Sequence, residues 1–247
     1  MRIPTIRGVI DRRILVNYRI APDVMAANLP MPFRPVLHNG FAIGGICLIR
    51  LKQVRPKPLP IPVGIRSENA AHRIAVSWET NGQTKEGVYI PRRDTDSMLN
   101  SFAGGTIFPG VHHHSEFKVA EEGDYYSVEM NCKETGNRVF VSGRAAKQTP
   151  SSSVFDSVES VSDFFERGSL GYSDTKKAGT YDGLELDCKN WHVQPFDVDV
   201  AESSYFDDES RFPAGSIEFD CALLMKDIDH EWHSREDICC VATKDQS

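Results

Sequence analysis

The residues best suited to binding a ligand or moving a proton gather in one stretch of the chain, residues 86–119. This stretch holds the adjacent arginines Arg92 and Arg93, a Gly-Gly pair, a Phe-Pro-Gly turn and three consecutive histidines, His112 to His114. A guanidinium group can hold a carboxylate or phosphate through two parallel hydrogen bonds. A histidine can exchange a proton near neutral pH. The stretch therefore predicts a ligand site for a small acidic or carbonyl compound.

The two arginines follow a predicted strand end. Because side chains alternate along a strand, one of Arg92 and Arg93 should face inward. That arginine would form either a buried ion pair or a ligand contact, and a surface pair with Asp94 or Asp96 is the plainer interpretation. We count Arg92 and Arg93, together with Tyr89, as candidate substrate-binding residues.

The histidine triplet opens a predicted strand, so His112 and His114 should share one face and His113 the other. Two histidines at this spacing can supply two metal ligands, and a third could come from Glu68, His72 or Glu116. Because the spacing fixes no third ligand, we predict no metal and no other cofactor. His112 is then a candidate substrate contact and His114 a candidate acid–base group.

Glu68 and His72 form a second candidate group, on either side of an Asn-Ala-Ala segment. A carboxylate that orients an imidazole is the arrangement of a general base. The alternative is a turn in which His72 is a buried core residue with its hydrogen bonds satisfied. The candidate catalytic residues are therefore Glu68, His72 and His114.

The elements that position these candidate residues are predicted to be mostly β-strands. Residues 14–20 alternate with the period of a strand, and residues 41–54 read as a buried strand that bends or bulges at Gly44 and Gly45. Asn81-Gly82 predicts one hairpin, and residues 133–137 predict another between residues 125–132 and 138–145.

Helices are few in this pattern. The sequence predicts a short helical turn from Pro22 and a helix over residues 94–102 that stops at two glycines. A further helix over residues 153–167 has apolar side chains at 3.6-residue spacing and ends before Gly168. With no linker or repeat in view, we expect one domain, residues 1–247, that is mainly β (α+β).

Bulk composition narrows the classes of partner. A net charge of −7 argues against non-specific binding of nucleic acids. No apolar run approaches the ~18 residues of a membrane-spanning helix. The first residues carry charge inside their apolar segment, unlike a secretory signal. Six scattered cysteines without C-x-x-C spacing predict reduced thiols. We expect a cytoplasmic protein with a small-molecule ligand and leave a homo-oligomer open.

Several longer phrases resemble a known family. GICLIRL, SENAAHRIAVSW, EGVYIPRRDT, FPGVHH, GSLGYS and EFDCALLM, spread over roughly residues 12–235, are similar to the bacterial family called domain of unknown function 2071. That family is grouped with the acetoacetate decarboxylase-like superfamily. The resemblance implies a closed antiparallel β-barrel with a few peripheral helices and a ligand cavity inside it.

The same resemblance argues against the best-known chemistry of that superfamily. Acetoacetate decarboxylases form a Schiff base through a lysine, and in them an aromatic-Pro pair precedes two adjacent lysines. Here Phe108-Pro109 is followed by Gly110-Val111, although Glu68 loosely matches a carboxylate of the family. Classical acetoacetate decarboxylase activity is therefore not expected.

The resulting hypothesis is a protein that binds a small organic acid or carbonyl compound in a barrel cavity. Lyase- or isomerase-like proton transfer without a Schiff-base lysine is the chemistry that would suit these groups. A non-catalytic binding or sensing module is one alternative. A metal-assisted hydrolase that uses His112 and His114 is the other.

Overall fold

Strands dominate the computed structural model, which describes residues 4–57, 64–97 and 110–239. Its long strands are β1 (Ile6–Ile20), β4 (Phe41–Pro56), β5 (Ile65–Thr80), β6 (Gln83–Thr95), β12 (Thr180–Cys188), β13 (Gln194–Ser203) and β14 (Ile217–Cys239). Shorter ones are β2 (Arg34–Pro35), β3 (Leu37–His38), β7 (His112–His114), β8 (Glu116–Glu122), β9 (Tyr125–Asn131), β10 (Arg138–Ala145) and β11 (Leu170–Asp174). Two helices accompany them in the described ranges, α1 (Pro22–Ala27) and α3 (Val158–Arg167).

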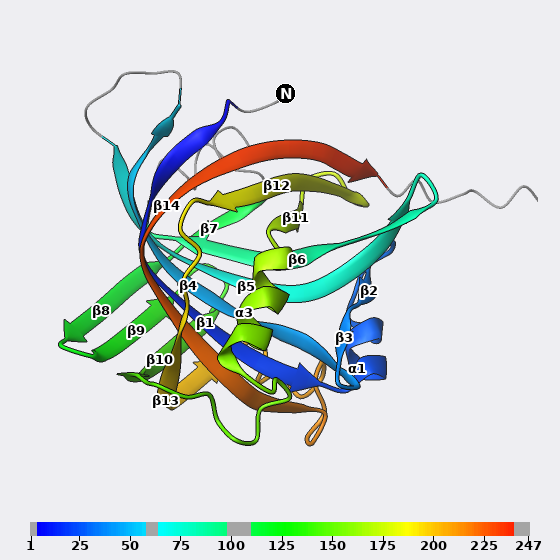
Figure 1. Ribbon diagram of the computed structural model, residues 1–247. Coiled ribbons are helices and arrows are strands. Elements are labelled where there is room, and N and C mark those ends of the chain that lie inside the picture. Colours follow the sequence, from blue (N-terminus) through cyan, green and yellow to red (C-terminus); the bar gives the residue numbers. More distant parts are fainter. Residues whose placement is uncertain (1–3, 58–63, 98–109, 240–247) are drawn as a thin grey trace, which may run out of the picture.

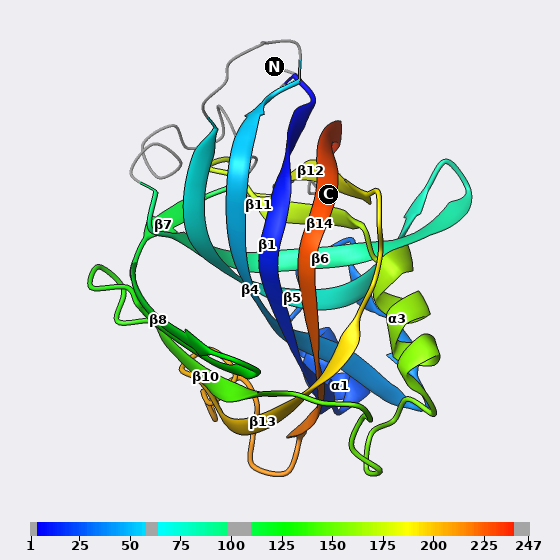
Figure 2. The same ribbon diagram turned by 60° about the vertical axis from the view of Figure 1, so that its left-hand side comes forward.

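Seven strands pair in a ring. The order is β1-β4-β5-β6-β11-β12-β14, and β14 pairs with β1 again from Ile6↔Trp232 to Ile20↔Ile217. Figures 1 and 2 show the same strands curving around a common interior, with α3 beside them. Because β6 pairs in parallel with β11 and β7, the sheet is mixed at this point, and the expectation of an antiparallel sheet throughout is corrected here.

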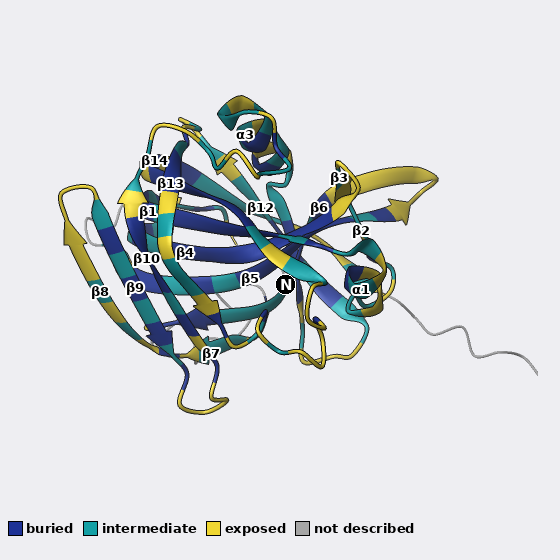
Figure 3. Cartoon of the chain, turned by 90° about the horizontal axis from the view of Figure 1, so that it is seen from below, coloured by how far each residue is buried: buried dark blue, intermediate teal, exposed yellow. Residues whose placement is uncertain are grey.

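A second layer of strands continues from the ring. β13 pairs with β14 at Gln194 and Pro195 and then with β10, which leads to β9 and β8. Figure 3 shows β8 as the exposed edge of this layer, whereas the ring strands are largely buried.

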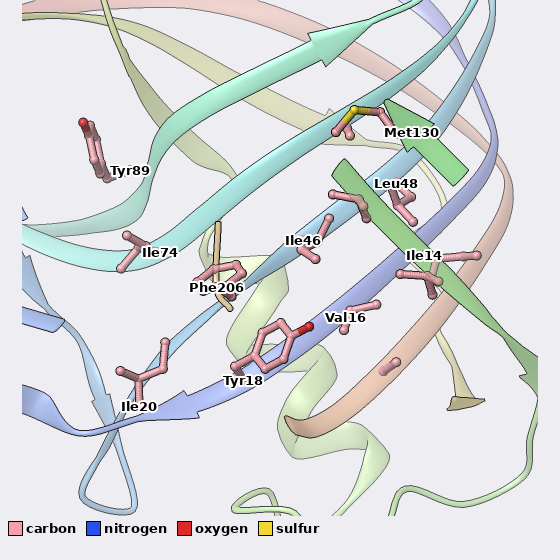
Figure 4. Packing of buried hydrophobic residues seen from close by; sticks show 14 of the residues in the cluster. Ile14, Val16, Tyr18, Ile20, Ile46, Leu48, Ile74, Tyr89, Met130 and Phe206 are labelled. Carbon is pink, nitrogen blue, oxygen red and sulfur yellow. The ribbon is translucent and has the colours of Figure 1, made fainter. Parts of the chain in front are cut away.

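The ring strands pack on both faces, and each face belongs to a separate hydrophobic core. Ile14, Val16 and Leu48 face the second layer, where they join Met130 in one apolar cluster (Figure 4). Alternate positions such as Leu15 face the ring interior and belong to a cluster with Phe165 of α3. Strands buried on both sides lack polar side chains over long runs, as β4 does from Phe41 to Ile49.

The hairpins predicted from the sequence are confirmed. Asn81 and Gly82 have positive φ angles of 50° and 73°, as a two-residue turn between β5 and β6 requires. β9 and β10 form the second hairpin. The helical turn at Pro22 is α1.

Two local predictions need correction. Asp94 and Thr95 continue β6 rather than opening a helix, and residues 98–102 of the predicted helix lie outside the described residues. No bulge interrupts the pairing of β4 at Gly44 and Gly45, where the register with β1 and β5 is continuous.

The helix predicted over residues 153–167 begins later, at Val158. Ser157 caps it, because its hydroxyl accepts a hydrogen bond from the Ser160 N–H at 3.1 Å. The preceding turn is held by Asp220, which accepts bonds from the Ser153 hydroxyl and the Val154 N–H at 2.7 and 2.8 Å. None of the described helices combines the length and apolar character that crossing a bilayer requires.

Candidate functional site

A cavity of about 130 Å³ lies within the ring of strands. At ~30 Å³ for each water in the liquid, this is about the room of four water molecules. Every strand of the ring contributes to its lining: Arg13 of β1, Cys47 of β4, Arg73 of β5, Arg93 of β6, Gly171 of β11, Leu184 of β12 and Trp232 of β14. Phe165 of α3 and Trp191 complete the wall, so the cavity is apolar apart from a few polar groups.

Three arginines line this cavity, and their hydrogen-bond partners are neutral. The Arg13 Nε donates to Cys47 Sγ at 3.2 Å, and the Arg93 Nε donates to the Ser173 hydroxyl at 2.8 Å. Arg73 donates to the side-chain oxygen of Asn17. Within the described ranges, no carboxylate forms an ion pair with Arg13, Arg73 or Arg93.

Arg73 is the most enclosed of the three, with 4% of its surface exposed. Its guanidinium carbon lies 4.2 Å from the centroid of the Phe165 ring. Its Nε and Nη1 are buried and have no hydrogen-bond partner among the described residues. A buried cation in this state is costly, and an anionic ligand would lower that cost.

Burial lowers the pKa of Arg73 to about 10, with a smaller contribution from the nearby Arg13. Burial also lowers the pKa of Arg93 to about 10, although Asp182 opposes this shift. Both groups therefore stay protonated at neutral pH. The cavity thus holds positive charge that no ion pair within the described chain compensates.

His112 lies beside Arg93, because β7 pairs in parallel with β6 at this residue pair. Its Nδ1 lies 3.3 Å from the carbonyl oxygen of Gly110. Since that oxygen can only accept, Nδ1 carries the proton and Nε2 is the acceptor nitrogen. Burial, reinforced by the charge of Arg93, lowers the pKa of His112 to about 3. His112 is therefore a neutral group at the cavity.

Of the predicted substrate-binding residues, Arg93 and His112 line the cavity. Arg92 faces the other way and binds both oxygens of Asp94, at 2.8 and 2.7 Å. The expected alternation between the two arginines is confirmed. Tyr89 donates its hydroxyl to Asp174 at 2.9 Å and stacks on Phe33 in the outer core, away from the cavity lining.

Glu68 and His72 do not form the general-base arrangement considered above. Both lie within β5 with three residues between them, so the rise of the strand separates them by ~13 Å. Glu68 accepts from Arg12 at 2.7 Å and from Arg50, in an ion-pair network on the outer face of the ring. The His72 Nε2 lies 3.0 Å from the Ser203 hydroxyl, in the core between the two layers.

His114 is exposed and is not part of the cavity lining. Groups of residues placed to hold a metal occur twice in the described chain: His113 with Cys132 and Glu134, and Asp187 with Glu231 and His233. Neither group contains His112 or His114. The pair considered for a metal-assisted hydrolase is thus not brought into a common ligand set.

Sequence reasoning missed Arg13, Arg73 and Cys47. The signal that could have found the arginines is a charged residue placed directly before an apolar run within a strand, as in the segments RRILV and HRIAV. An arginine at such a position must reach either solvent or an internal site.

A family model described as an uncharacterized conserved protein, domain of unknown function 2071, matches residues 10–221. None of the curated proteins matches the chain significantly.

Solved structures of similar fold include acetoacetate decarboxylase from Legionella pneumophila, at 13% identity and a TM-score of 0.62 over 95% of this chain and 88% of that one. An acetoacetate decarboxylase-like enzyme from Sphingomonas wittichii RW1 has 10% identity and a TM-score of 0.57, over 96% and 92%. The enduracididine biosynthesis enzyme MppR, complexed with pyruvate, has 11% identity and a TM-score of 0.56, over 95% and 89%. These likenesses show an acetoacetate decarboxylase-like fold.

Proposed function

Because the chain belongs to the family called domain of unknown function 2071 and has an acetoacetate decarboxylase-like fold, we propose that it binds a small organic acid or carbonyl compound in the cavity within its ring. The observation that carries this proposal is the set Arg13, Arg73 and Arg93, three cations that line one cavity without a carboxylate partner among the described residues. A carboxylate ligand would supply the missing charge.

Two further features support the proposal. The neighbour MppR is a pyruvate complex, so a protein of this fold holds a small keto acid. The pairing of β1 with β14 supports a closed barrel, in one domain, whose interior is the cavity. The free cysteines of the described chain fit a reducing compartment such as the cytoplasm.

The proposed ligand does not form a Schiff base. No lysine lines the cavity in the described part of the chain. Any acid–base step would fall to His112, whose acceptor nitrogen and neighbouring Arg93 suit proton transfer next to a carbonyl. Glu68, His72, Arg92 and Tyr89 already have structural partners elsewhere.

Calorimetric titration with pyruvate tests the binding claim. We expect saturable binding that Arg93→Gln weakens by about 10- to 100-fold, because a hydrogen bond to a charged group contributes ~1.5–3 kcal/mol. Arg167→Gln is the matched control, since it removes an exposed arginine from the end of α3 near the cavity. Equal affinities for wild type and both variants would rule out the arginine site.

Two chemical readouts separate the enzymatic hypotheses. Borohydride treatment with pyruvate followed by intact mass should give no trapped adduct, and a stable adduct would restore Schiff-base chemistry. Deuterium uptake at the pyruvate methyl group that His112→Gln abolishes would identify an acid–base enzyme. Binding without exchange would identify a binding or sensing module.

A further inference from the structure

We infer that the ligand of this cavity is a compact dianion with two separate acidic groups, a short dicarboxylate, with one group held by Arg13 and Arg73 and the other by Arg93. This inference rests on the proposed function and specifies its ligand class. It follows from the charge of the lining, from how the arginines are anchored, and from the size of the cavity.

The charge count favours more than one negative group. Asp94 is the carboxylate among the described lining residues, and its oxygens are occupied by Arg92 and by the Ser115 hydroxyl at 2.9 Å. The charge of Asp182 acts on Arg93 but forms no ion pair with it among the described residues, and Asp182 accepts a hydrogen bond from the Gly110 N–H at 3.2 Å. A monocarboxylate would leave two of the three guanidinium charges without a counter-charge in a poorly solvated site.

The arginines are anchored in two groups. Arg13 is held by sulfur atoms of Cys47 and Met225, at 3.2 and 3.9 Å. Arg73 is held by Asn17, which like Arg13 belongs to β1, and the two arginines are close enough that the charge of Arg13 lowers the pKa of Arg73.

Arg93 is anchored apart from this pair. Its Nε donates to Ser173 of β11, and its strand neighbour is His112 of β7. Arg13 and Arg73 are instead anchored through Cys47 of β4 and Asn17 of β1. Two separately anchored cationic sites on the wall of one cavity match two acidic groups joined by a short chain.

The size of the cavity limits that chain. About 130 Å³ suits a compact molecule. The small residues Ala71, Cys47 and Gly171 leave this space between the arginines, and Leu184 and Trp232 offer apolar contacts to the connecting carbons. A four-carbon diacid has the right size and charge.

Calorimetric titration with butyrate, succinate and inorganic phosphate tests the inference, because butyrate and succinate have equal length and differ in the second carboxylate. We expect wild type to bind succinate at least 10-fold more tightly than butyrate. Arg93→Gln should remove this difference, and Arg167→Gln should keep it. Arg13→Gln should weaken both ligands and provides a second variant should Arg93→Gln fail to fold.

The outcomes are separable. Equal affinities of wild type for succinate and butyrate would overturn the two-site inference while leaving the proposed binding of organic acids in place. Tighter binding of phosphate than of succinate would also overturn it, in favour of a single dianionic group. No binding of butyrate, succinate or pyruvate would overturn both the inference and the proposed function.

Discussion

Arg73 lies inside the ring with 4% of its surface exposed, and two of its nitrogens have no hydrogen-bond partner in the described chain. Burying a charge in this way costs free energy that the fold must supply elsewhere. Binding sites commonly trade stability for function in this manner. The three arginines are therefore better explained by a ligand than by the packing of the core.

Arg73→Met should make the ligand-free protein more stable. The change removes a buried charge and two unpaired nitrogens, and its gain should exceed the lost hydrogen bond to Asn17. We expect an increase of about 1–3 kcal/mol in the free energy of unfolding, measured with urea, together with loss of pyruvate binding. The exposed Arg167→Met should change stability by less than about 0.5 kcal/mol. A destabilised Arg73→Met protein that still binds pyruvate would contradict this account.

His72 should make the fold sensitive to acid. Burial, with the charge of Arg92, lowers the pKa of His72 from 6.5 to about 3 in the folded protein. The unfolded chain therefore binds this proton first, so stability is complete above pH 6.5 and falls as the pH drops toward 3. The slope for one such histidine approaches about 1.4 kcal/mol per pH unit.

Urea titrations between pH 7 and 4 measure this effect. His72→Gln should flatten the fall in unfolding free energy, because glutamine does not titrate. His192→Gln, at an exposed position, is the matched control and should leave the slope unchanged. Identical slopes for wild type and His72→Gln would show that His72 does not carry the acid sensitivity.

Residue types alone could place only part of this site. Strand alternation correctly separated Arg93 from Arg92, since adjacent residues face opposite sides of one strand. Arg13 and Arg73 were not anticipated, because both faces of β1 and β5 are buried and apolar patterning cannot tell the ring interior from the outer core.

At the scale of elements, the packing of β4 against β1 leaves no room for a side chain at Gly45. A Cβ at Gly45 would lie 2.1 Å from the Val16 carbonyl oxygen, a backbone atom that cannot move aside. A Cβ at the adjacent Gly44 would meet the ends of the Ile20 and Met25 side chains at 3.0 and 3.3 Å, which can rotate. The glycine pair predicted to bend the strand is thus explained by close packing at one of its members.

Gly45→Ala should therefore destabilise the protein by at least about 2 kcal/mol, or prevent folding, because the clash displaces paired backbone. Gly44→Ala should stay within about 1 kcal/mol of wild type. Thermal or urea unfolding of the two variants measures the difference. Equal stabilities would show that the ring tolerates separation of β1 and β4.

The helix wrongly begun at Asp94 shows how tertiary contacts override a local signal. An acidic residue before apolar ones suits a helix cap, yet Asp94 is held in β6 by Arg92 and Ser115. Ser115 lies 21 residues further along the chain, and Asp94 pairs with His113 of β7. A pattern read along the chain cannot include them.

At the scale of the whole molecule, the ring depends on contacts between distant segments. β1 and β14 pair between residues more than 190 positions apart, such as Ile20 and Ile217. Hairpins could be predicted because their signals are local. The pairing of β1 with β14 could not be predicted from periodicity. The resemblance to a family did imply that the sheet closes on itself.

The cavity exists only because the ring and α3 come together. Phe165 of α3 lies over Arg73 of β5, and Trp191 donates to Ser162 of α3 at 2.9 Å. Arg13, Arg73 and Arg93 come from three strands that share a single interior. The proposed ligand site is thus a property of the assembled fold rather than of one motif.

The most direct test is a crystal structure of the protein with succinate. The account predicts succinate inside the ring, with one carboxylate within hydrogen-bond distance of Arg13 and Arg73 and the other within that distance of Arg93. Succinate bound only at the surface, or a cavity filled by side chains with these arginines paired to carboxylates, would contradict it.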